Sequence, residues 1–455
     1  QHRIDSSRPV EVFEFGPGTG RHAFLLQREL RRVERLSRAF VPGGLRFRLH
    51  LAELGSKGLD SLARHENFQE ALADGTLVLH LFDITSHDLP THYHPPGMTL
   101  ALPSPNPVFV ITNYILDSLP HDVLRISEGK AKLGRTKLEV KGLKKSQVPT
   151  SLKDLGERIK LTFDFPEEGV EYPAEGWNEL VRHYERLGGI THVPFPTAAL
   201  RLCERCRRWS ESAAVFLVAD KSFTTMSQLV ELEAPELVPH GGGFSFNANL
   251  HALGFVAQRL GGKAHHTPSR DGTLDLSHLV IPAPGVEEFH AVDRFRTKES
   301  VDDLQKGYPL RICLDLVRLT GFDPQVLYEL SDHILEGLEK EEENLAEMEE
   351  ELAEILPRVL PLVFALPDDT DTAFEIGRIA YRIESYELAR QAFHMSLQQY
   401  GEDARTFFNL GLIWYYRESY QLAVREFEKA LELKSDYDDA KKWLKKAREK
   451  GAVPV

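Results

Sequence analysis

Residues 14–20 read Glu-Phe-Gly-Pro-Gly-Thr-Gly and directly follow an apolar run, Val10–Phe13. Glycine permits left-handed backbone and lets a ligand approach without a Cβ in the way. An apolar run before the glycines and a helical apolar period after them predict a strand, a sharp turn and a helix with free N–H groups at its start. The spacing excludes a dinucleotide fingerprint, because Arg21 stands where G-x-G-x-x-G needs its third glycine.

Strand-like and helix-like patterns alternate over residues 10–120, which predicts a parallel α/β sheet. We expect strands over 10–13, 46–54, 77–83, 107–113 and 213–219, and helices over 21–40 and 59–72. A polar residue closes each strand: Glu14, Glu53, Asp83, Asn113 and Asp220. Ligands bind at this carboxyl edge of open α/β sheets. Caps and turns also favour Asp and Asn at strand ends, so each single position has this alternative explanation.

The E-x-G-x-G-x-G string resembles the first motif of class I S-adenosylmethionine (SAM)-dependent methyltransferases. In that family the glycine turn passes under the amino-acid end of the cofactor. The carboxylate of Glu53 can accept hydrogen bonds from both ribose hydroxyls, Asp83 is placed for the adenine amino group, and Glu14 for the loop or the ammonium. The candidate cofactor-binding residues are Glu14, Gly16, Gly18, Gly20, Glu53, Asp83 and Asn113.

Residues 113–120 read N-Y-I-L-D-S-L-P, which is similar to the N-E-x-x-D-A-L-P motif of the MidA-like methyltransferases. That family includes mitochondrial assembly factors of respiratory complex I, which methylate a protein arginine. The resemblance implies catalytic roles for Asn113 and Asp117 and a protein side chain, with arginine possible, as acceptor. Tyr114 replaces the family's glutamate, and Lys221-Ser222 replaces Tyr-Gly after a later strand. Activity and target residue therefore stay open at this point.

A repeat of 34 residues, the period of tetratricopeptide repeats (TPR), occupies the C-terminal segment. The matching pairs are Gly377/Gly411, Tyr386/Tyr420, Ala389/Ala423, Phe393/Phe427 and Leu397/Leu431. Small residues let two helices approach closely, and the aromatic residues fill the gap to the next unit. Helices over about 324–366 are expected to complete the stack, and residues 437–449 to cap it.

The concave face of such repeats binds peptides, and arginines among aromatic residues suit an acidic or C-terminal carboxylate peptide. We expect this face to bind a protein or peptide partner. The candidate partner-binding residues are Arg378, Arg382, Phe408 and Tyr415.

The composition of the chain argues against several classes of protein. A net charge of −14 over 455 residues argues against a nucleic-acid binder. No apolar stretch approaches the roughly 20 residues of a membrane span. Three cysteines in so long a chain suit a reducing cytoplasm, and the lone Cys203-x-x-Cys206 lacks further ligands, so no metal is expected.

We expect His92, His94, His265 and His266 on the surface or in loops. Because the chain begins with Gln1, we expect N-terminal residues to be missing.

These patterns predict an α/β Rossmann-like SAM methyltransferase domain followed by an all-α TPR domain. The expected boundaries are 1–295 with an insertion at about 121–210, a helical region 296–370, and TPR repeats with a capping helix over 371–455. Two alternatives remain open: a catalytically inactive scaffold that acts through its TPR repeats, and a small-molecule methyltransferase. The oligomeric state is not predicted.

Overall fold

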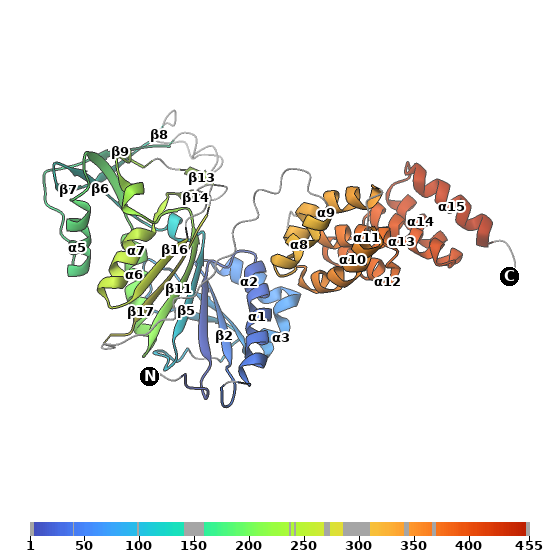
Figure 1. Ribbon diagram of the computed structural model, residues 1–455, viewed down its shortest axis with the longest axis horizontal. Helices are drawn as coiled ribbons and strands as arrows, with labels where there is room; N and C mark the ends of the chain where they lie inside the picture. The colour runs from blue at the N-terminus through green and yellow to red at the C-terminus, as the bar shows by residue number, and fades with distance from the viewer. Residues whose placement is uncertain are drawn as a thin grey trace. The chain divides into compact units, whose positions relative to one another are not determined.

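The computed structural model describes residues 4–39, 41–97, 100–140, 159–235, 238–240, 243–267, 274–284, 310–340, 345–365 and 370–451. The chain divides into two compact units, 1–297 and 298–455. The first unit is built around a sheet and the second consists of helices (Figure 1).

An eight-stranded sheet, with strand order β16-β17-β11-β5-β1-β2-β3-β4, organises the first unit. Its strands are β1 (Val10–Phe15), β2 (Phe47–Glu53), β3 (Leu77–Leu81), β4 (Thr91–His94), β5 (Val108–Asn113), β11 (Ala213–Asp220), β16 (Lys263–Thr267) and β17 (Asp275–Pro282). The five strands that the sequence predicted are the parallel centre, and β4, β16 and β17 pair antiparallel at the edges. The chain runs from β1 to β2 and β3 in one direction and to β5 and β11 in the other, so strand order reverses at β1. Ligands of open α/β sheets bind at such a reversal.

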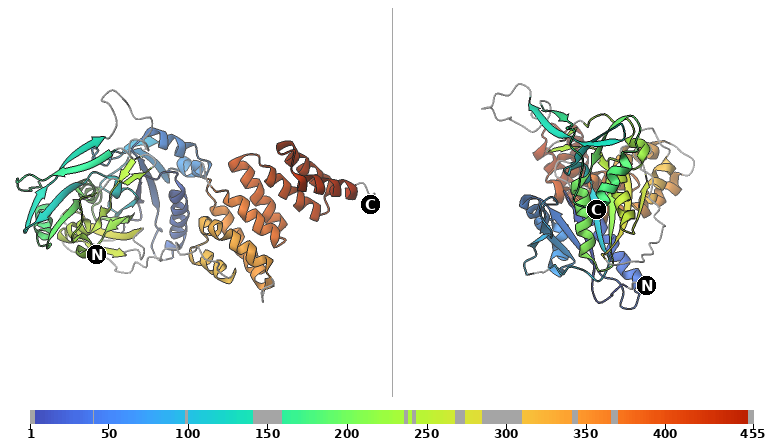
Figure 2. Two further views of the ribbon diagram at one scale, coloured as in Figure 1. Left: turned by 90° about the horizontal axis from the view of Figure 1, so that it is seen from above. Right: turned by 90° about the vertical axis from the view of Figure 1, so that its left-hand side faces the viewer.

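Helices cover both faces of this sheet (Figures 1 and 2). On one side lie α1 (Arg21–Ser37), α2 (Ser56–Arg64) and α3 (Gln69–Asp74), and on the other α6 (Thr197–Cys206) and α7 (Leu250–Arg259). Phe13 and Phe15 pack with Trp209 at ring distances of 5.1 and 6.2 Å on the second side. The layers leave the carboxyl ends of the central strands free for the loops that follow them.

The single helix expected over 59–72 is wrong, because the structure has α2 and α3 with a 3-10 turn, Glu66–Phe68, between them. His65 has extended backbone, φ −67° and ψ 127°, and its side chain accepts a hydrogen bond from the N–H of Asn67. This local cap ends α2 although the apolar period continues past it.

A buried polar chain crosses three neighbouring strands of the sheet. The imidazole of His50 lies 2.7 Å from the carboxylate of Glu11 and 2.8 Å from the ring nitrogen of His80. Burial lowers the pKa of both histidines. His92 and His94 on β4 and His266 on β16 are half-buried in strands, so the expectation of surface or loop positions is wrong for these three, whereas His265 on β16 is exposed as expected.

Residues 122–140 and 159–195 add a smaller layer. Its elements are β6 (Asp122–Ser127), β7 (Lys130–Leu133), β8 (Arg135–Val140), β9 (Ile159–Asp164), α5 (Glu175–Tyr184) and β10 (Ile190–Phe195). Strands β10, β6 and β7 form one sheet and β8 and β9 a hairpin. Tyr172 stacks on Phe195 with ring centroids 4.6 Å apart. Four short strands follow β11: β12 (Ser222–Phe223), β13 (Val238–His240), β14 (Gly243–Ser245) and β15 (Ala248–Asn249).

The second unit contains paired helices. They are α8 (Leu310–Leu319), α9 (Pro324–Glu339), α10 (Leu345–Val359), α11 (Thr372–Arg382), α12 (Tyr386–Tyr400), α13 (Ala404–Tyr416), α14 (Tyr420–Leu433) and α15 (Asp438–Gly451). A Cβ on Gly377 would lie 2.5 Å from the Phe393 ring, and one on Gly411 equally close to Phe427. This confirms that a small residue lets the two helices of a unit approach closely. Phe393 and Phe427 fill the space within their own unit, however, and not the predicted gap to the next one.

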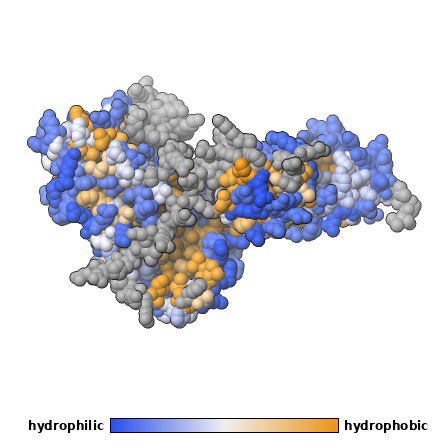
Figure 3. Space-filling view, in the orientation of Figure 1, coloured by the Kyte–Doolittle hydropathy of each residue, from blue (hydrophilic) through white to orange (hydrophobic). Residues whose placement is uncertain are grey.

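The last helix and the face of the repeats that Figure 3 shows are mostly polar. Along α15 only Ala440, Leu444 and Ala447 are buried, which suits the predicted cap. The face of α11–α15 in Figure 3 is mostly hydrophilic. Among the described residues, no helix combines the length and apolarity needed to cross a membrane.

Candidate functional site

The glycine turn lies at the carboxyl end of β1, where strand order reverses. Gly16, Gly18 and Gly20 have φ of 62°, 55° and 85°. A Cβ on Gly16 would lie 2.2 Å from Ile115, whereas one on Gly18 would meet nothing within 4 Å. The turn is thus tightly packed at Gly16 and open at Gly18, so a ligand can reach its backbone there.

Two carboxylates border this open position. Glu53, at the end of β2, accepts a hydrogen bond of 3.2 Å from the N–H of Gly18. Burial raises the pKa of Glu53. Glu14 is 3% exposed and contacts the imidazole of His22 at 3.0 Å, and this hydrogen bond raises the pKa of His22. The second carboxylate oxygen of Glu14 is buried and has no partner among the described residues. A buried acceptor of this kind needs a hydrogen-bond donor. The ammonium group of a ligand could be that donor.

Asp83 and Asn113 also end at this edge, in different surroundings. Asp83 follows β3 and accepts hydrogen bonds from Thr85 and from the hydroxyl of Ser86, which lower its pKa to about 2. The carboxylate thus stabilises a turn, as acidic residues at strand ends commonly do. Its two oxygens can still accept a further hydrogen bond. Asn113 is exposed at the end of β5.

The segment after β5 forms a strained turn. Tyr114 is 47% exposed and has φ of +52°, a conformation that non-glycine residues rarely adopt. Its N–H donates to the carbonyl of Ala219 on β11 at 2.9 Å. The buried carboxylate of Asp220 accepts from the N–H groups of Leu116 at 2.8 Å and Asp117 at 3.3 Å. The end of β11 therefore holds the turn that carries Asn113 and Asp117.

Asp117 is 4% exposed and connects this turn to a neighbouring cleft. Its carbonyl accepts from the N–H of Phe246 at 2.9 Å. Phe246 lines a cleft of about 250 Å³, whose other lining residues are His192, Pro194, Phe223, Leu232, Glu233, Pro235 and Asn247. Sequence reasoning noticed Asp220 only as a strand end, and no single sequence pattern marks the whole cleft, because its residues come from separate segments.

Replacing Asp220 by asparagine is expected to change the pH dependence of stability. Burial, with Asp117 nearby, raises the pKa of Asp220 to about 7. Between about pH 4 and pH 7 the unfolded chain loses this proton while the folded chain keeps it, so stability falls as pH rises through this window. Asp220→Asn removes this fall, which is worth roughly 1–3 kcal/mol. Urea unfolding of variant and wild type at about pH 5 and pH 8 measures the difference.

Asp83→Asn is the matched control. The pKa of Asp83 is lowered, so its contribution to stability is lost only below the usual pKa of an aspartate, outside this window. Its difference from wild type should be equal at both pH values. If the free energy of unfolding of Asp220→Asn also differs from wild type by the same amount at both pH values, the raised pKa of Asp220 is contradicted.

The predicted partner-binding residues lie on α11 and α13. Arg378 pairs with Glu375 at 2.8 Å and lies 3.9 Å from Asp332, and Arg382 donates to the carbonyl of Leu338. Both arginines therefore link α11 to α9 within the stack. Phe408 contacts the rings of Phe427 and Tyr437, and Tyr415 those of Tyr416, Tyr420 and Trp443.

Metal-binding groups do not occur in the described part of the chain, where no three His, Cys, Asp or Glu side chains are arranged to hold an ion. Cys203 and Cys206 are buried free thiols on α6. Burial raises the pKa of both well above the ordinary thiol value, so they stay protonated.

Part of the chain is similar to a Burkholderia thailandensis protein that is inferred to be a methyl transferase and is bound to S-adenosyl-homocysteine. The match covers 58% of this chain and 58% of that chain at 15% identity, with a TM-score of 0.33. Other similar structures are MamA and the Cut9–Hcn1 hetero-tetramer of the APC/C. They match at 16% and 18% identity, over 31% and 30% of this chain and 86% and 25% of theirs, with TM-scores of 0.23 and 0.24.

No model of a protein family and no curated protein matches this sequence. At TM-scores of 0.23 to 0.33, these similarities carry neither the fold nor a function over to this chain. The sheet topology and the 34-residue repeat give the chain an α/β Rossmann-like fold of methyltransferase type followed by an all-α TPR domain.

Proposed function

We propose that the chain is a SAM-dependent methyltransferase that modifies a protein side chain, with its TPR unit recruiting the substrate or a partner. The observation that carries the proposal is the open glycine turn at the switch point, bordered by Glu14 and Glu53. A pyrophosphate would be disfavoured beside two carboxylates, whereas the ammonium and ribose hydroxyls of SAM are donors that both could accept.

Each residue then has a role. Glu53 would bind the ribose diol, the unpartnered oxygen of Glu14 the ammonium, and Asp83 the adenine amino group. SAM supplies a methyl group activated by its sulfonium. The remaining task is to align the acceptor and take its proton, for which Asn113 and Asp117 are the candidates. The conformation of their turn depends on Asp220.

The cleft beside Asp117 supports an acceptor that enters as a side chain. Phe223, Phe246 and Pro194 offer apolar contact, and Glu233 is the carboxylate among its lining residues. A long side chain with a cationic end, such as arginine, combines these two properties. This agrees with the resemblance to the MidA-like family, which we propose as the family of the first unit.

The main alternative is an inactive scaffold, which one observation favours. Tyr114 stands where the family motif has glutamate, so a carboxylate that would bind a guanidinium is replaced by an exposed phenol. In either case we propose that α11 and α13 bind a protein or peptide. Because Arg378 and Arg382 already have acidic or carbonyl partners, an incoming carboxylate would have to compete with them. We propose a cytoplasmic location.

Calorimetric titration with SAM tests the proposal. We expect wild-type protein to bind in the micromolar range, typical of enzyme substrates at about 1 μM to 1 mM. Glu53→Ala should weaken binding at least about tenfold, because two hydrogen bonds to a charged acceptor are lost. Glu29→Ala, an exposed glutamate on α1, is the control and should bind as wild type.

Wild-type protein that does not bind SAM at about 1 mM would rule out the enzyme and support the scaffold. If SAM binds, incubation with methyl-labelled SAM and cell extract identifies the acceptor class. Label in protein supports the proposal, and label only in small molecules would replace it by the small-molecule alternative.

A further inference from the structure

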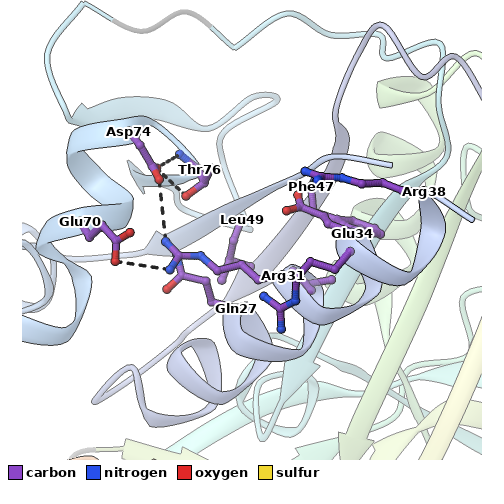
Figure 4. A pocket seen from close by; sticks show the side chains of 11 residues that line it. Gln27, Arg31, Glu34, Arg38, Phe47, Leu49, Glu70, Asp74 and Thr76 are labelled. Carbon is purple, nitrogen blue, oxygen red and sulfur yellow. Dashed lines mark hydrogen bonds and ion pairs between the residues drawn. The ribbon is translucent and has the colours of Figure 1, made fainter. Parts of the chain in front are cut away.

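A second cleft, of about 320 Å³, lies between α1, α3 and the starts of β2 and β3 (Figure 4). Phe47 begins β2 and Thr76 directly precedes β3, so this cleft is at the amino-terminal edge of the sheet. The glycine turn is at the carboxyl edge. The cleft is therefore separate from the proposed cofactor site.

The acidic groups of this cleft already have partners. Arg31 lies 3.4 Å from Glu70 and 3.8 Å from Asp74, as the dashed lines in Figure 4 show. The carboxylate of Glu34 accepts a hydrogen bond of 2.7 Å from the N–H of Phe47. Each of the three carboxylates in the lining thus has a donor partner within the protein.

Several hydrogen-bond donors of the cleft, in contrast, have no partner in the described part of the chain. Within the part of the chain that the structure describes, neither Arg35 nor Arg38 has an ion pair or a side-chain hydrogen bond. Gln27 is 7% exposed, and its buried Nε2 has no partner. A buried amide without a partner costs about 1–3 kcal/mol, so the site lacks an acceptor.

The charge of this region also differs from the rest of the chain. Helix α1 carries five arginines and two glutamates, and Arg38 follows it, in a protein with a net charge of −14. The floor of the cleft is apolar, with Leu30, Phe47 and Leu49. The volume is at the small end of ligand pockets, which hold about 300–1,000 Å³.

We propose that this cleft binds a small organic anion, with a phosphate or carboxylate group held by Arg35 and Arg38 and a second acceptor group, farther along the cleft, bound by the amide of Gln27. Guanidinium groups match both head groups, and the apolar floor contacts the carbon skeleton. The site does not depend on methyltransferase activity.

Calorimetry with pyrophosphate and with citrate, in the full chain, tests this site and distinguishes the two head groups. We expect saturable binding of at least one probe with one site per chain. Arg35→Gln combined with Arg38→Gln should weaken binding at least about tenfold, since two charge-assisted contacts are lost. Gln27→Leu should also weaken it.

Arg32→Gln is the matched control, because it removes one charge from the same helix at an arginine that pairs with exposed Glu29. It should bind the probe within about twofold of wild type. A thermal melt checks that Gln27→Leu is folded. Because Arg35 and Arg38 are exposed, we expect the double variant to fold normally, so it tests the site even if Gln27→Leu does not fold. The proposal is overturned if neither probe binds, or if Arg32→Gln loses as much affinity as the double variant.

Discussion

Replacing Gly411 by alanine is expected to destabilise the helical unit by about 1–3 kcal/mol, the usual cost of overpacking a filled core. The new Cβ would lie 2.5 Å from two atoms of the Phe427 ring, which is fully buried and cannot move into solvent. Helices α13 and α14 would have to separate. Urea unfolding followed by far-ultraviolet circular dichroism measures the loss.

Shortening the opposing side chain provides the control. Phe427→Leu alone should destabilise the unit, because it leaves a cavity where the ring was. Combined with Gly411→Ala, it should cost less than the sum of the two single variants, since the smaller side chain makes room for the methyl group. Strictly additive losses would contradict direct contact between positions 411 and 427.

Gly16→Ala is expected to reduce SAM affinity at least about 100-fold, or roughly 2.7 kcal/mol. The Cβ would lie 2.2 Å from the Cδ1 of Ile115, and alanine disfavours the φ of +62°. The turn must therefore shift away from Ile115, which moves the N–H of Gly18 relative to Glu53. Calorimetric titration with SAM measures the effect.

Two variants isolate this cause. Gly55 directly precedes α2, close in sequence to Glu53, with φ of −120° and open space at its Cβ position, so Gly55→Ala should bind SAM as wild type does. Adding Ile115→Ala to Gly16→Ala removes the clashing atom and should restore part of the affinity. The explanation fails if Gly16→Ala binds normally or if the second substitution recovers nothing.

Much of the fold could be predicted because its signals are local. The five parallel strands and α1 follow apolar periods, and α11–α14 follow a repeat with a small residue opposite an aromatic ring. The prediction failed at 59–72, where a cap by His65 interrupts a continuing apolar period. It also failed for His92, His94 and His266, which are half-buried in edge strands. No sequence period showed that Glu11 and His80 both contact His50.

The candidate site was predictable only in outline. Strand ends marked Glu14, Glu53 and Asp83 as edge residues, but not that Asp83 is bound by its own turn. The left-handed Tyr114 and the hydrogen bonds from its turn to Asp220 had no sequence signal, because residues about a hundred positions apart make them. The contacts of Arg378 and Arg382 with α9 also had no sequence signal, and their predicted role in binding a partner stays a prediction.

The sequence by itself determined the glycine spacing at 14–20, the acids that end the strands and the 34-residue period. These are properties of neighbouring residues, and steric and hydrophobic preferences act on them directly. Only the tertiary structure decided that β1 lies between β2 and β5, which brings Glu53 to the glycine turn and packs Ile115 against Gly16. Strand order and side-chain pairing depend on contacts between distant segments, which no local period encodes.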